Sequence, residues 1–408
     1  MTKKSGHTTR QKLVLLRSVF EAVDEIVNNN KILEKVLEKI NRENGHWTNG
    51  QRRFVSETTR SLIRYRRLLF EALDLPETKE YSLYLYWQLY GVLLLLQGKD
   101  PKEFPSLKEF KSYEVTGRLK RFSENLEIRE SYPEWFFKEA KKQLGEQWSE
   151  TAVWLNKPAD YFIRINTLKC TKLELVESLK KEGIECYETS LSKDAQKLES
   201  AEYVFKSTAF KNGWFEVQDL ASQLVSDYLA PKPGSKVIDA CSGTGGKTLA
   251  LAALMKNKGK IIAADIIERK FIELKKRAAR AGVQIIETKN ANELGIEDNW
   301  ADYLLIDAPC SGTGVWRRNP DGKWKLTEEK LRELEEIQKN ILNTYTRYLK
   351  SGGNLVYAVC SILPSEGKKI IEEFLKQNKN MWELEGEKSL LPQYFDTDGF
   401  YMALLKKN

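Results

Sequence analysis

The sequence predicts an α/β protein whose C-terminal half forms a mostly parallel sheet, and two observations carry that prediction. From Gly213 onward, short apolar runs alternate with segments of helical periodicity, which favours a parallel sheet. Upstream, apolar residues recur at three- and four-residue steps, as on one face of an amphipathic helix. A chain of 408 residues is long for one domain, so we expect two or three.

Composition indicates a globular protein with a mild excess of basic charge. Charged residues make up 30% and hydrophobic residues 41%, with a formal net charge of +8. That excess favours a polyanionic partner, although a basic solvated surface explains it as well. The most apolar run, Leu83 to Gln97, is short for a membrane span and predicts a buried helix. We expect no membrane association and a monomer.

Cysteine and histidine usage narrows the chemistry. The five cysteines are sparse and odd in number, which argues against a disulfide framework and favours a reducing, cytoplasmic setting. Residues 1–6 lack the apolar core of a signal peptide. His7 and His46 are the two histidines, and both lie far in sequence from the glycine and cysteine loops. Histidine catalysis and a metal site are therefore not expected.

Three segments follow one another along the chain. Residues 1–126 predict a helical domain with many arginines, which form either a solvated face or a phosphate-contacting surface. Residues 127–212 predict a small α+β module. Its expected strands, with one just beyond it, are Tyr161–Ile165, Ile184–Tyr187, Ala201–Phe205 and Trp214–Val217. Residues 213–408 predict the parallel α/β domain.

Five strands and five helices are expected in that last domain, with a final edge strand near residues 399–405. The strands are Lys236–Ala240, Lys260–Asp265, Gln284–Glu287, Tyr303–Asp307 and Asn354–Val359. The helices are Asp219–Leu229, Lys247–Met255, Glu268–Ala281, Thr327–Leu349 and Lys368–Lys376. Ligands of open α/β sheets bind outside the carboxyl ends of the strands, so loops at those ends are candidate site elements.

A glycine loop follows the first strand of this domain. Residues 239–248 read DACSGTGGKT, and glycines there allow close backbone approach to a ligand at a helix N-terminus. Asp265 ends the next strand, where a carboxylate suits a ribose diol. The pattern predicts an adenosine-bearing cofactor, either NAD or S-adenosylmethionine. Against NAD, the glycine spacing is not GxGxxG.

Two cysteines follow later strands and indicate nucleophilic chemistry. Cys310 lies in residues 307–314 (DAPCSGTG) and Cys360 follows the strand that ends at Val359. A thiolate is the strongest side-chain nucleophile near neutral pH. With Asp307 and an adenosine cofactor, the set fits methylation of cytosine C5, in which a thiolate adds to C6 and makes C5 nucleophilic. Cys170 and Cys186 lack such a context, and we expect them to be structural.

These motifs resemble the Sun family of RNA cytosine-C5 methyltransferases, in its bacterial, RsmB-like branch that methylates 16S ribosomal RNA. The resemblance rests on residues 218–224 (QDLASQL), the two cysteine loops, residues 317–321 (RRNPD) and the tail 398–403 (DGFYMA). It covers residues 213–408 strongly. It implies a class I S-adenosylmethionine-dependent methyltransferase domain, preceded by a NusB-like helical RNA-binding domain and an RRM-like module.

The resemblance also implies roles for individual residues. Cys360 would be the nucleophile, Cys310 would aid release of the product, and Asp307 would contact the cytosine edge and the cofactor. The cofactor would be held by Cys241, Ser242, Gly243, Thr244, Gly245, Gly246, Lys247, Asp265, Asn290 and Asp307. RNA would be contacted by Lys247, Arg317, Arg318 and Trp324. Basic and aromatic side chains together suit phosphate contact and base stacking, although packed tryptophans would give the same pattern.

Some positions depart from the family pattern. The glycine loop reads CSGTGGK where the family has CAAPGGK, Asn290 replaces an acidic residue, and Val359 replaces a threonine before the nucleophile. Other interpretations of the function also stay open. A tRNA or another RNA could be the substrate, and a DNA cytosine-C5 methyltransferase would use Cys310 as its nucleophile. An amino-group methyltransferase fits poorly because Pro309-Cys310 stands where such enzymes hold the amine, and a non-enzymatic RNA-binding factor would not need two thiols.

Overall fold

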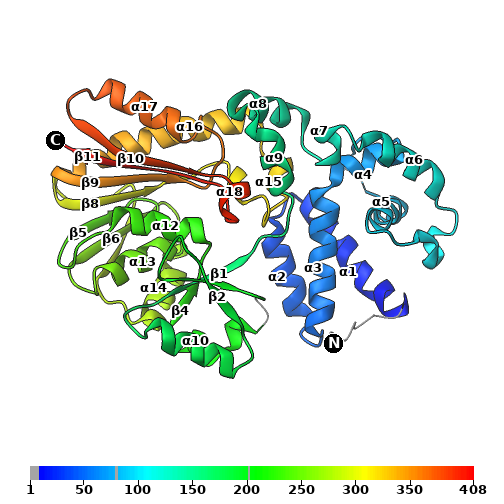
Figure 1. The fold of residues 1–408 in the computed structure, drawn as a ribbon, viewed down its shortest axis with the longest axis horizontal. Helices are drawn as coiled ribbons and strands as arrows, with labels where there is room; N and C mark the ends of the chain where they lie inside the picture. The colour runs from blue at the N-terminus through cyan, green and yellow to red at the C-terminus, as the bar shows by residue number, and fades with distance from the viewer. Residues whose placement is uncertain (1–8, 79–80, 201–202) are drawn as a thin grey trace. The chain divides into compact units, whose positions relative to one another are not determined.

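The computed structural model describes residues 9–78, 81–200 and 203–408, and the chain forms two compact units (Figure 1). The first unit comprises Met1–Lys157 and Trp316–Glu328, and the second comprises Pro158–Val315 and Glu329–Asn408. The chain therefore leaves the second unit a few residues after Cys310 and returns to it at Glu329. Each unit is described by itself below.

The first unit is helical, as the periodicity predicts. Its helices are α1 (Thr9–Val27), α2 (Leu33–Glu43), α3 (Asn49–Arg64), α4 (Arg66–Leu73), α5 (Leu83–Leu96), α6 (Ser112–Phe122), α7 (Leu126–Arg129), α8 (Glu134–Leu144), α9 (Gln147–Trp154) and α15 (Gly322–Lys325). Thr48 begins α3 with a capping box, since its side chain accepts from the Gln51 backbone and the Gln51 side chain accepts from the Thr48 backbone. The apolar run at α5 is a core helix, with Leu89 and Leu93 buried. No helix in the described ranges has the length and apolarity that a bilayer crossing requires.

Residues 316–328 complete the core of this helical unit. The Trp316 ring is buried, with its centroid 4.4 Å from that of Phe136. Lys323 is fully buried as well, and its Nζ donates to the Asn156 Oδ1 at 2.6 Å. Burial lowers the pKa of Lys323 well below its ordinary range. A segment that follows the cysteine loop in sequence thus belongs to the helical unit.

The second unit begins with a small four-stranded antiparallel sheet in the order β2-β3-β1-β4. The strands are β1 (Tyr161–Ile165), β2 (Cys186–Glu188), β3 (Ala195–Leu198) and β4 (Phe215–Val217), with α10 (Lys172–Lys181) and α11 (Thr208–Lys211). The prediction of a strand at residues 201–205 is wrong for the residues that the structure describes, because Val204–Lys206 is a 3-10 turn. Residues 201–202 lie outside the described ranges. The strand that sequence reasoning missed is β3, whose AQKL sequence lacks apolar alternation.

The larger sheet has seven strands in the order β10-β11-β9-β8-β5-β6-β7. The five parallel strands are β5 (Lys236–Asp239), β6 (Lys260–Asp265), β7 (Ile286–Asn290), β8 (Ala301–Asp307) and β9 (Leu349–Val359). All five were expected. The expected edge strand at the C-terminus is β11 (Phe400–Lys407), but it is not the edge, because β10 (Trp382–Leu390) pairs with its other side. The sequence did not predict β10, because exposed charged residues interrupt its hydrophobic pattern.

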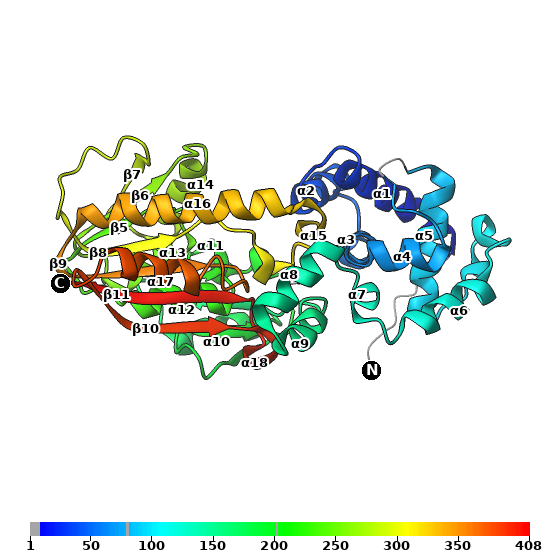
Figure 2. The ribbon, with the colours of Figure 1, turned by 90° about the horizontal axis from the view of Figure 1, so that it is seen from above.

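Helices cover both faces of this sheet (Figure 1). One face packs on α12 (Leu220–Leu229), α13 (Gly246–Leu254) and α14 (Lys270–Ala281), through residues such as Val237 and Val356. The other face packs on α16 (Glu328–Tyr345) and α17 (Lys368–Gln377), through residues such as Ile238 and Tyr357. Figure 2 shows these last two helices running along the sheet. Alternate residues of each central strand thus enter different cores, which explains their continuous apolar runs.

Candidate active site

Three neighbouring strands deliver the candidate site residues to one edge of the sheet. β8 lies between β5 and β9, with Asp239 paired to Leu305 and Asp307 paired to Ala358. The loops that follow these strands carry the glycines, Cys310 and Cys360. The parallel register therefore places the glycine loop, one aspartate and two thiols at adjacent strand ends.

The two thiols lie against each other. The Cys310 and Cys360 Sγ atoms are 3.3 Å apart, and both residues are partly buried. Their loops are joined by a hydrogen bond from the Gly314 N–H to the Cys360 carbonyl, at 3.1 Å. The pKa of the Cys310 thiol is raised well above its ordinary range, first by its hydrogen bond with Cys360 and then by burial. Either sulfur can be the donor in this contact, so one thiol can pass its proton to the other.

An ion pair lies at the end of β8. The Lys247 Nζ donates to the Asp307 Oδ2 at 2.7 Å, and it lies 5.2 Å from the centre of the Phe400 ring. Burial by itself would lower the pKa of Lys247, but the charge and hydrogen bond of Asp307 outweigh it and raise the pKa. Lys247 is therefore a cation at neutral pH, placed where it can donate to a substrate atom.

A cavity of about 250 Å³ opens beside this pair. Its lining residues are Val217, Gln218, Ser222, Asp239, Cys241, Ser242, Gly243, Thr244, Gly246, Lys247, Arg277 and Asp307. Gly243, which lines the cavity, has a φ of +55°, a left-handed backbone conformation that glycine adopts without strain. Burial raises the pKa of Asp239, at the floor of the cavity, to about 7. The same cause raises the pKa of Cys241 far above the physiological range.

The predicted ribose and adenine residues lie at the next strand ends. Asp265 ends β6 and accepts from the Gly243 N–H at 3.0 Å and from the Lys270 Nζ at 3.1 Å. Asn290 ends β7 directly opposite Asp265 in the register, and its Nδ2 donates to Glu268 at 2.8 Å. Because the Lys270 side chain is partly exposed, it can move from Asp265 and leave the carboxylate to hydroxyl donors.

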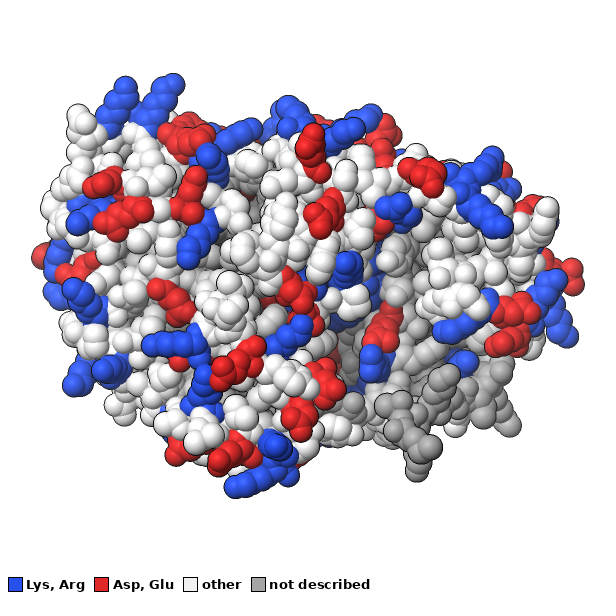
Figure 3. Space-filling view, viewed as in Figure 1, with Lys and Arg blue, Asp and Glu red and all other residues white. Residues whose placement is uncertain are grey.

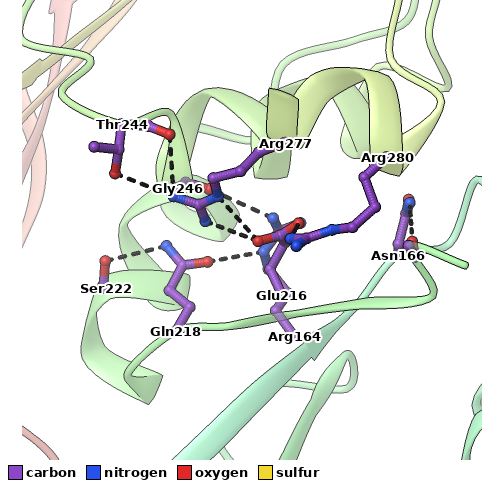
Figure 4. Close-up of polar contacts among 10 residues, drawn as sticks. Arg164, Asn166, Glu216, Gln218, Ser222, Thr244, Gly246, Arg277 and Arg280 are labelled. Carbon is purple, nitrogen blue, oxygen red and sulfur yellow. Dashed lines mark hydrogen bonds and ion pairs between the residues drawn. The ribbon is translucent and has the colours of Figure 1, made fainter. Parts of the chain in front are cut away.

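A buried carboxylate ties the glycine loop to α14 (Figure 4). Glu216 of β4 accepts from the Arg277 Nη2 at 2.9 Å and also pairs with Arg280. The Arg277 Nη1 reaches the Thr244 carbonyl at 3.0 Å and the Thr244 hydroxyl at 3.1 Å. The small sheet therefore positions Arg277, and Arg277 in turn holds the glycine loop.

A second series of hydrogen bonds connects the small sheet to the wall of the cavity (Figure 4). Arg164 of β1 is buried, and its Nε donates to the Gln218 Oε1 at 2.8 Å. The Gln218 amide donates to Ser222 at 3.1 Å, and both residues line the cavity. Burial lowers the pKa of Arg164 to about 10, which still leaves it charged at neutral pH. Arg164 thus fixes the orientation of a polar cavity wall.

Of the predicted RNA contacts, Lys247 belongs to the site described above, and the other three belong to the helical unit. Arg317 is 3% exposed within the helical unit, where its carbonyl accepts from Arg64 at 2.7 Å. The Trp324 indole donates to the Ile63 carbonyl at 2.7 Å and is partly buried. Burial of Arg317 leaves little of its side chain for a phosphate, and Arg318 is the more exposed of the two arginines. Basic and acidic side chains are interspersed over the face in Figure 3.

Sequence reasoning missed several residues that shape the site. Arg277 and Glu216 carry no motif, and their roles depend on packing of β4 against α14. Gln218 was noted in a motif without a role. Glu366 was also missed; it is a buried carboxylate on the loop after Cys360. Residues 363–370 read LPSEGKKI, and nothing in that sequence singles out Glu366 from the nearby charged residues.

The polar groups that line the cavity fit a cofactor that carries an adenosyl group on a sulfonium. The glycine loop leaves room for close approach, and Asp265 is placed for a ribose. The buried Ser242 hydroxyl and the Asp239 Oδ1 have no hydrogen-bond partner among the described residues, so both atoms can form a hydrogen bond with a ligand in the cavity. In the described ranges, no cluster of three or more His, Cys, Asp or Glu side chains is placed to hold a metal ion.

Fold and site together define a Rossmann-like enzyme of the class I methyltransferase type. Family models match two regions: the 16S rRNA methyltransferase RsmB/F model covers residues 226–406, and the RsmF/B-like ferredoxin-like domain covers residues 132–204. The second match overlaps the predicted small module. The predicted three-segment division of the chain stays a prediction, since the structure groups residues 127–157 with the helices.

Curated relatives extend the match over most of the chain. The chain is 33% identical over 294 residues to the ribosomal RNA small subunit methyltransferase B of Proteus mirabilis, covering 71% of this chain and 68% of that one. It is 32% identical over 313 residues to the protein of that name in Photorhabdus laumondii, covering 74% and 72%. The chain belongs to the RsmB/F methyltransferase family.

Solved structures share the fold. The crystal structure of PH0851 superposes with a TM-score of 0.82 at 26% identity, covering 99% of this chain and 100% of that one. A methyltransferase homologue from Pyrococcus horikoshii gives a TM-score of 0.62 at 28% identity over 70% of this chain and 98% of that one.

Proposed function

We propose that this protein transfers a methyl group from S-adenosylmethionine to C5 of a cytosine in RNA, with Cys360 as the nucleophile. The observation that carries the proposal is the pair of thiols 3.3 Å apart beside the Lys247–Asp307 ion pair. Two adjacent thiols suit a reaction in which one sulfur must first bond to the base and later leave it. The relatives named above point to 16S ribosomal RNA as the substrate.

Residues of this chain carry the covalent steps. The Cys360 thiolate adds to C6, and the electron pair of the C5–C6 double bond moves through the ring to N3 and the carbonyl. Lys247 and Asp307 hold the cytosine edge: the Lys247 ammonium donates to an acceptor, and the carboxylate accepts from the exocyclic amine or the protonated N3. The bound cofactor supplies an electrophilic methyl group, which C5 attacks.

Transfer of the C5 proton to a water molecule then re-forms the double bond and expels the Cys360 sulfur as thiolate. Cys310 lies in hydrogen-bond contact with that sulfur, so it aids this release by returning a proton to it. The choice of Cys360 rather than Cys310 as nucleophile follows the family resemblance, since either sulfur of the pair can be the hydrogen-bond donor.

The cofactor would lie across three strand ends. Residues 241–247 would line the methionine and sulfonium portion, Asp265 would accept from the ribose hydroxyls, and Asn290 would contact the adenine. A stacked base cannot reach this cavity, so single-stranded or looped RNA is the favoured target. Arg318 is the side chain we retain as an RNA contact in residues 316–328. We also propose that the enzyme acts in the cytoplasm as a monomer.

Nucleoside mass spectrometry tests this function. The full chain would be incubated with isotopically labelled S-adenosylmethionine and, in separate reactions, with 16S ribosomal RNA, small-subunit particles or tRNA, and the RNA would then be digested to nucleosides. Labelled 5-methylcytidine is the expected product. Label in a base-methylated adenosine, or in tRNA cytidine alone, would overturn the reaction or the substrate assignment respectively.

A further inference from the structure

The carboxylate of Glu366 joins the two cysteine loops. Its Oε1 accepts from the Ser311 N–H at 2.7 Å and from the Gln338 amide at 3.1 Å. Its Oε2 accepts from the hydroxyls of Ser311 and Ser361. Ser311 directly follows Cys310 and Ser361 directly follows Cys360. One carboxylate therefore fixes the residue next to each thiol.

Other groups reinforce the same point. The Gln338 amide also donates to the Pro309 carbonyl at 2.9 Å, so α16 holds the residue before Cys310 as well. The Tyr357 hydroxyl of β9 donates to the Glu366 carbonyl at 2.7 Å. Glu366 has no exposed surface, and the donors to its carboxylate among the described residues are all neutral. Among the residues that the structure describes, no cation donates to this carboxylate.

We propose that Glu366 is a positioning residue that locks the two cysteine loops in one arrangement and sets a buried negative charge beside Cys310, leaving Cys360 to act as nucleophile. The role of Cys360 as nucleophile in this inference rests on the proposed function, whereas the arrangement of the two loops does not. The charge of Cys360 raises the pKa of Lys247, and the Lys247 ammonium also donates to Asp307. The two thiols therefore face unequal fields.

Electrostatics agrees with this division. The pKa of Cys310 is raised by its Cys360 contact, by burial, by the Cys360 charge and then by the Glu366 charge. The other titratable groups that face the pair are Tyr357 on β9, whose own pKa burial raises, and the Lys247–Asp307 pair. Burial raises the pKa of Glu366, while its hydrogen bonds from Ser311, Ser361 and Gln338 oppose that shift. Four donors to one carboxylate are the pattern of the ionised form.

Site-resolved alkylation tests the proposal without RNA or cofactor. Full-length protein would be treated with iodoacetamide from pH 6 to 10, and modification of each cysteine would be followed by mass spectrometry. In the wild type, Cys360 is expected to react at lower pH than Cys310. Glu366→Gln keeps the shape but removes the charge, so the Cys310 profile should move to lower pH by about one unit, a tenfold faster reaction at fixed pH.

Two further variants separate charge from packing. Glu366→Asp keeps the charge and should leave the Cys310 profile at high pH. Asp227→Asn removes a partly buried carboxyl that accepts from Ser192, away from both loops, and should leave both profiles unchanged. An unchanged Cys310 profile in Glu366→Gln would overturn the proposal. If that variant does not fold, the wild-type order decides, because a Cys310 that reacts at lower pH than Cys360 contradicts the proposal.

Methylation assays distinguish this proposal from the proposed function. If the enzyme methylates cytosine, Glu366→Gln should change the release rate of its covalent RNA adduct at least tenfold, while the KM for S-adenosylmethionine stays the same. If no methylation occurs with any RNA but the alkylation profiles shift as expected, the function is wrong and the positioning role of Glu366 stands.

Discussion

Replacing Arg277 by methionine should weaken cofactor binding without unfolding the protein. Arg277→Met removes both hydrogen bonds to Thr244 and one ion pair to Glu216 (Figure 4). Glu216 keeps its pair with Arg280, so no buried charge is left without a partner. The loss therefore falls on the glycine loop, which becomes free to leave the arrangement that the cavity requires.

The size of the effect follows from the two contacts to Thr244. Hydrogen bonds to charged groups contribute about 1.5–3 kcal/mol when buried. Thr244 is exposed, so screening by water reduces each to about 0.5–1 kcal/mol. Together they correspond to about a tenfold rise in Kd for S-adenosylmethionine, since 1.4 kcal/mol is a factor of ten.

Arg280→Met is the matched control. Arg280 lies on the same helix, pairs with the same Glu216, and packs 4.0 Å from the Phe210 ring, but it makes no hydrogen bond to Thr244. Titration calorimetry with S-adenosylmethionine should give a raised Kd for Arg277→Met and a Kd near wild type for Arg280→Met, at comparable thermal stability. Equal Kd values for the two variants would refute the reasoning, because the loop contact would then be irrelevant.

Two other predictions concern stability. The pKa of Asp239 is about 7 in the folded chain against an ordinary 3.8, because burial disfavours its charge. The free energy of unfolding is therefore highest at low pH, where Asp239 is protonated in both states. It falls as the pH rises from about 3.8 through about 7, by up to about 4 kcal/mol. Thermal melting should show Asp239→Asn stabilised relative to wild type at pH 8 and much less so at pH 5, and an equal difference at both would contradict this. Separately, a Cβ at Gly314 would lie 1.9 Å from the Gly399 carbonyl oxygen, so Gly314→Ala should cost about 2–3 kcal/mol and disturb both cysteine loops. Gly117→Ala, whose Cβ meets nothing within 4 Å, is its control, and the idea fails if the two variants melt alike.

Most of the parallel sheet could be predicted because its central strands are buried on both faces. Such strands read as unbroken apolar runs, as in residues 303–306 and 355–359, and each ends in a glycine or cysteine loop. β10 and β3 escaped prediction for the opposite reason. β10 has alternating charged residues on exposed positions, and β3 is short and polar, so only pairing with their neighbours defines them as strands.

The convergence of Asp307, Cys310 and Cys360 could be expected because strand ends of a parallel sheet meet at one edge. The supporting residues could not. Glu216, Arg277 and Glu366 act through contacts between elements distant in sequence, and a single sequence carries no signal of such contacts. The basic and aromatic stretch at residues 316–325 was ambiguous from sequence, and burial of Trp316, Arg317 and Lys323 in the helical unit explains much of it.

Covalent trapping tests the central proposal most directly. RNA that contains 5-fluorocytidine would be incubated with S-adenosylmethionine and with wild type, Cys360→Ala or Cys310→Ala protein, because fluorine at C5 blocks the final elimination. A stable protein–RNA adduct on a denaturing gel is expected for wild type and Cys310→Ala and not for Cys360→Ala. An adduct that is lost only in Cys310→Ala would reverse the roles of the two thiols and contradict the account.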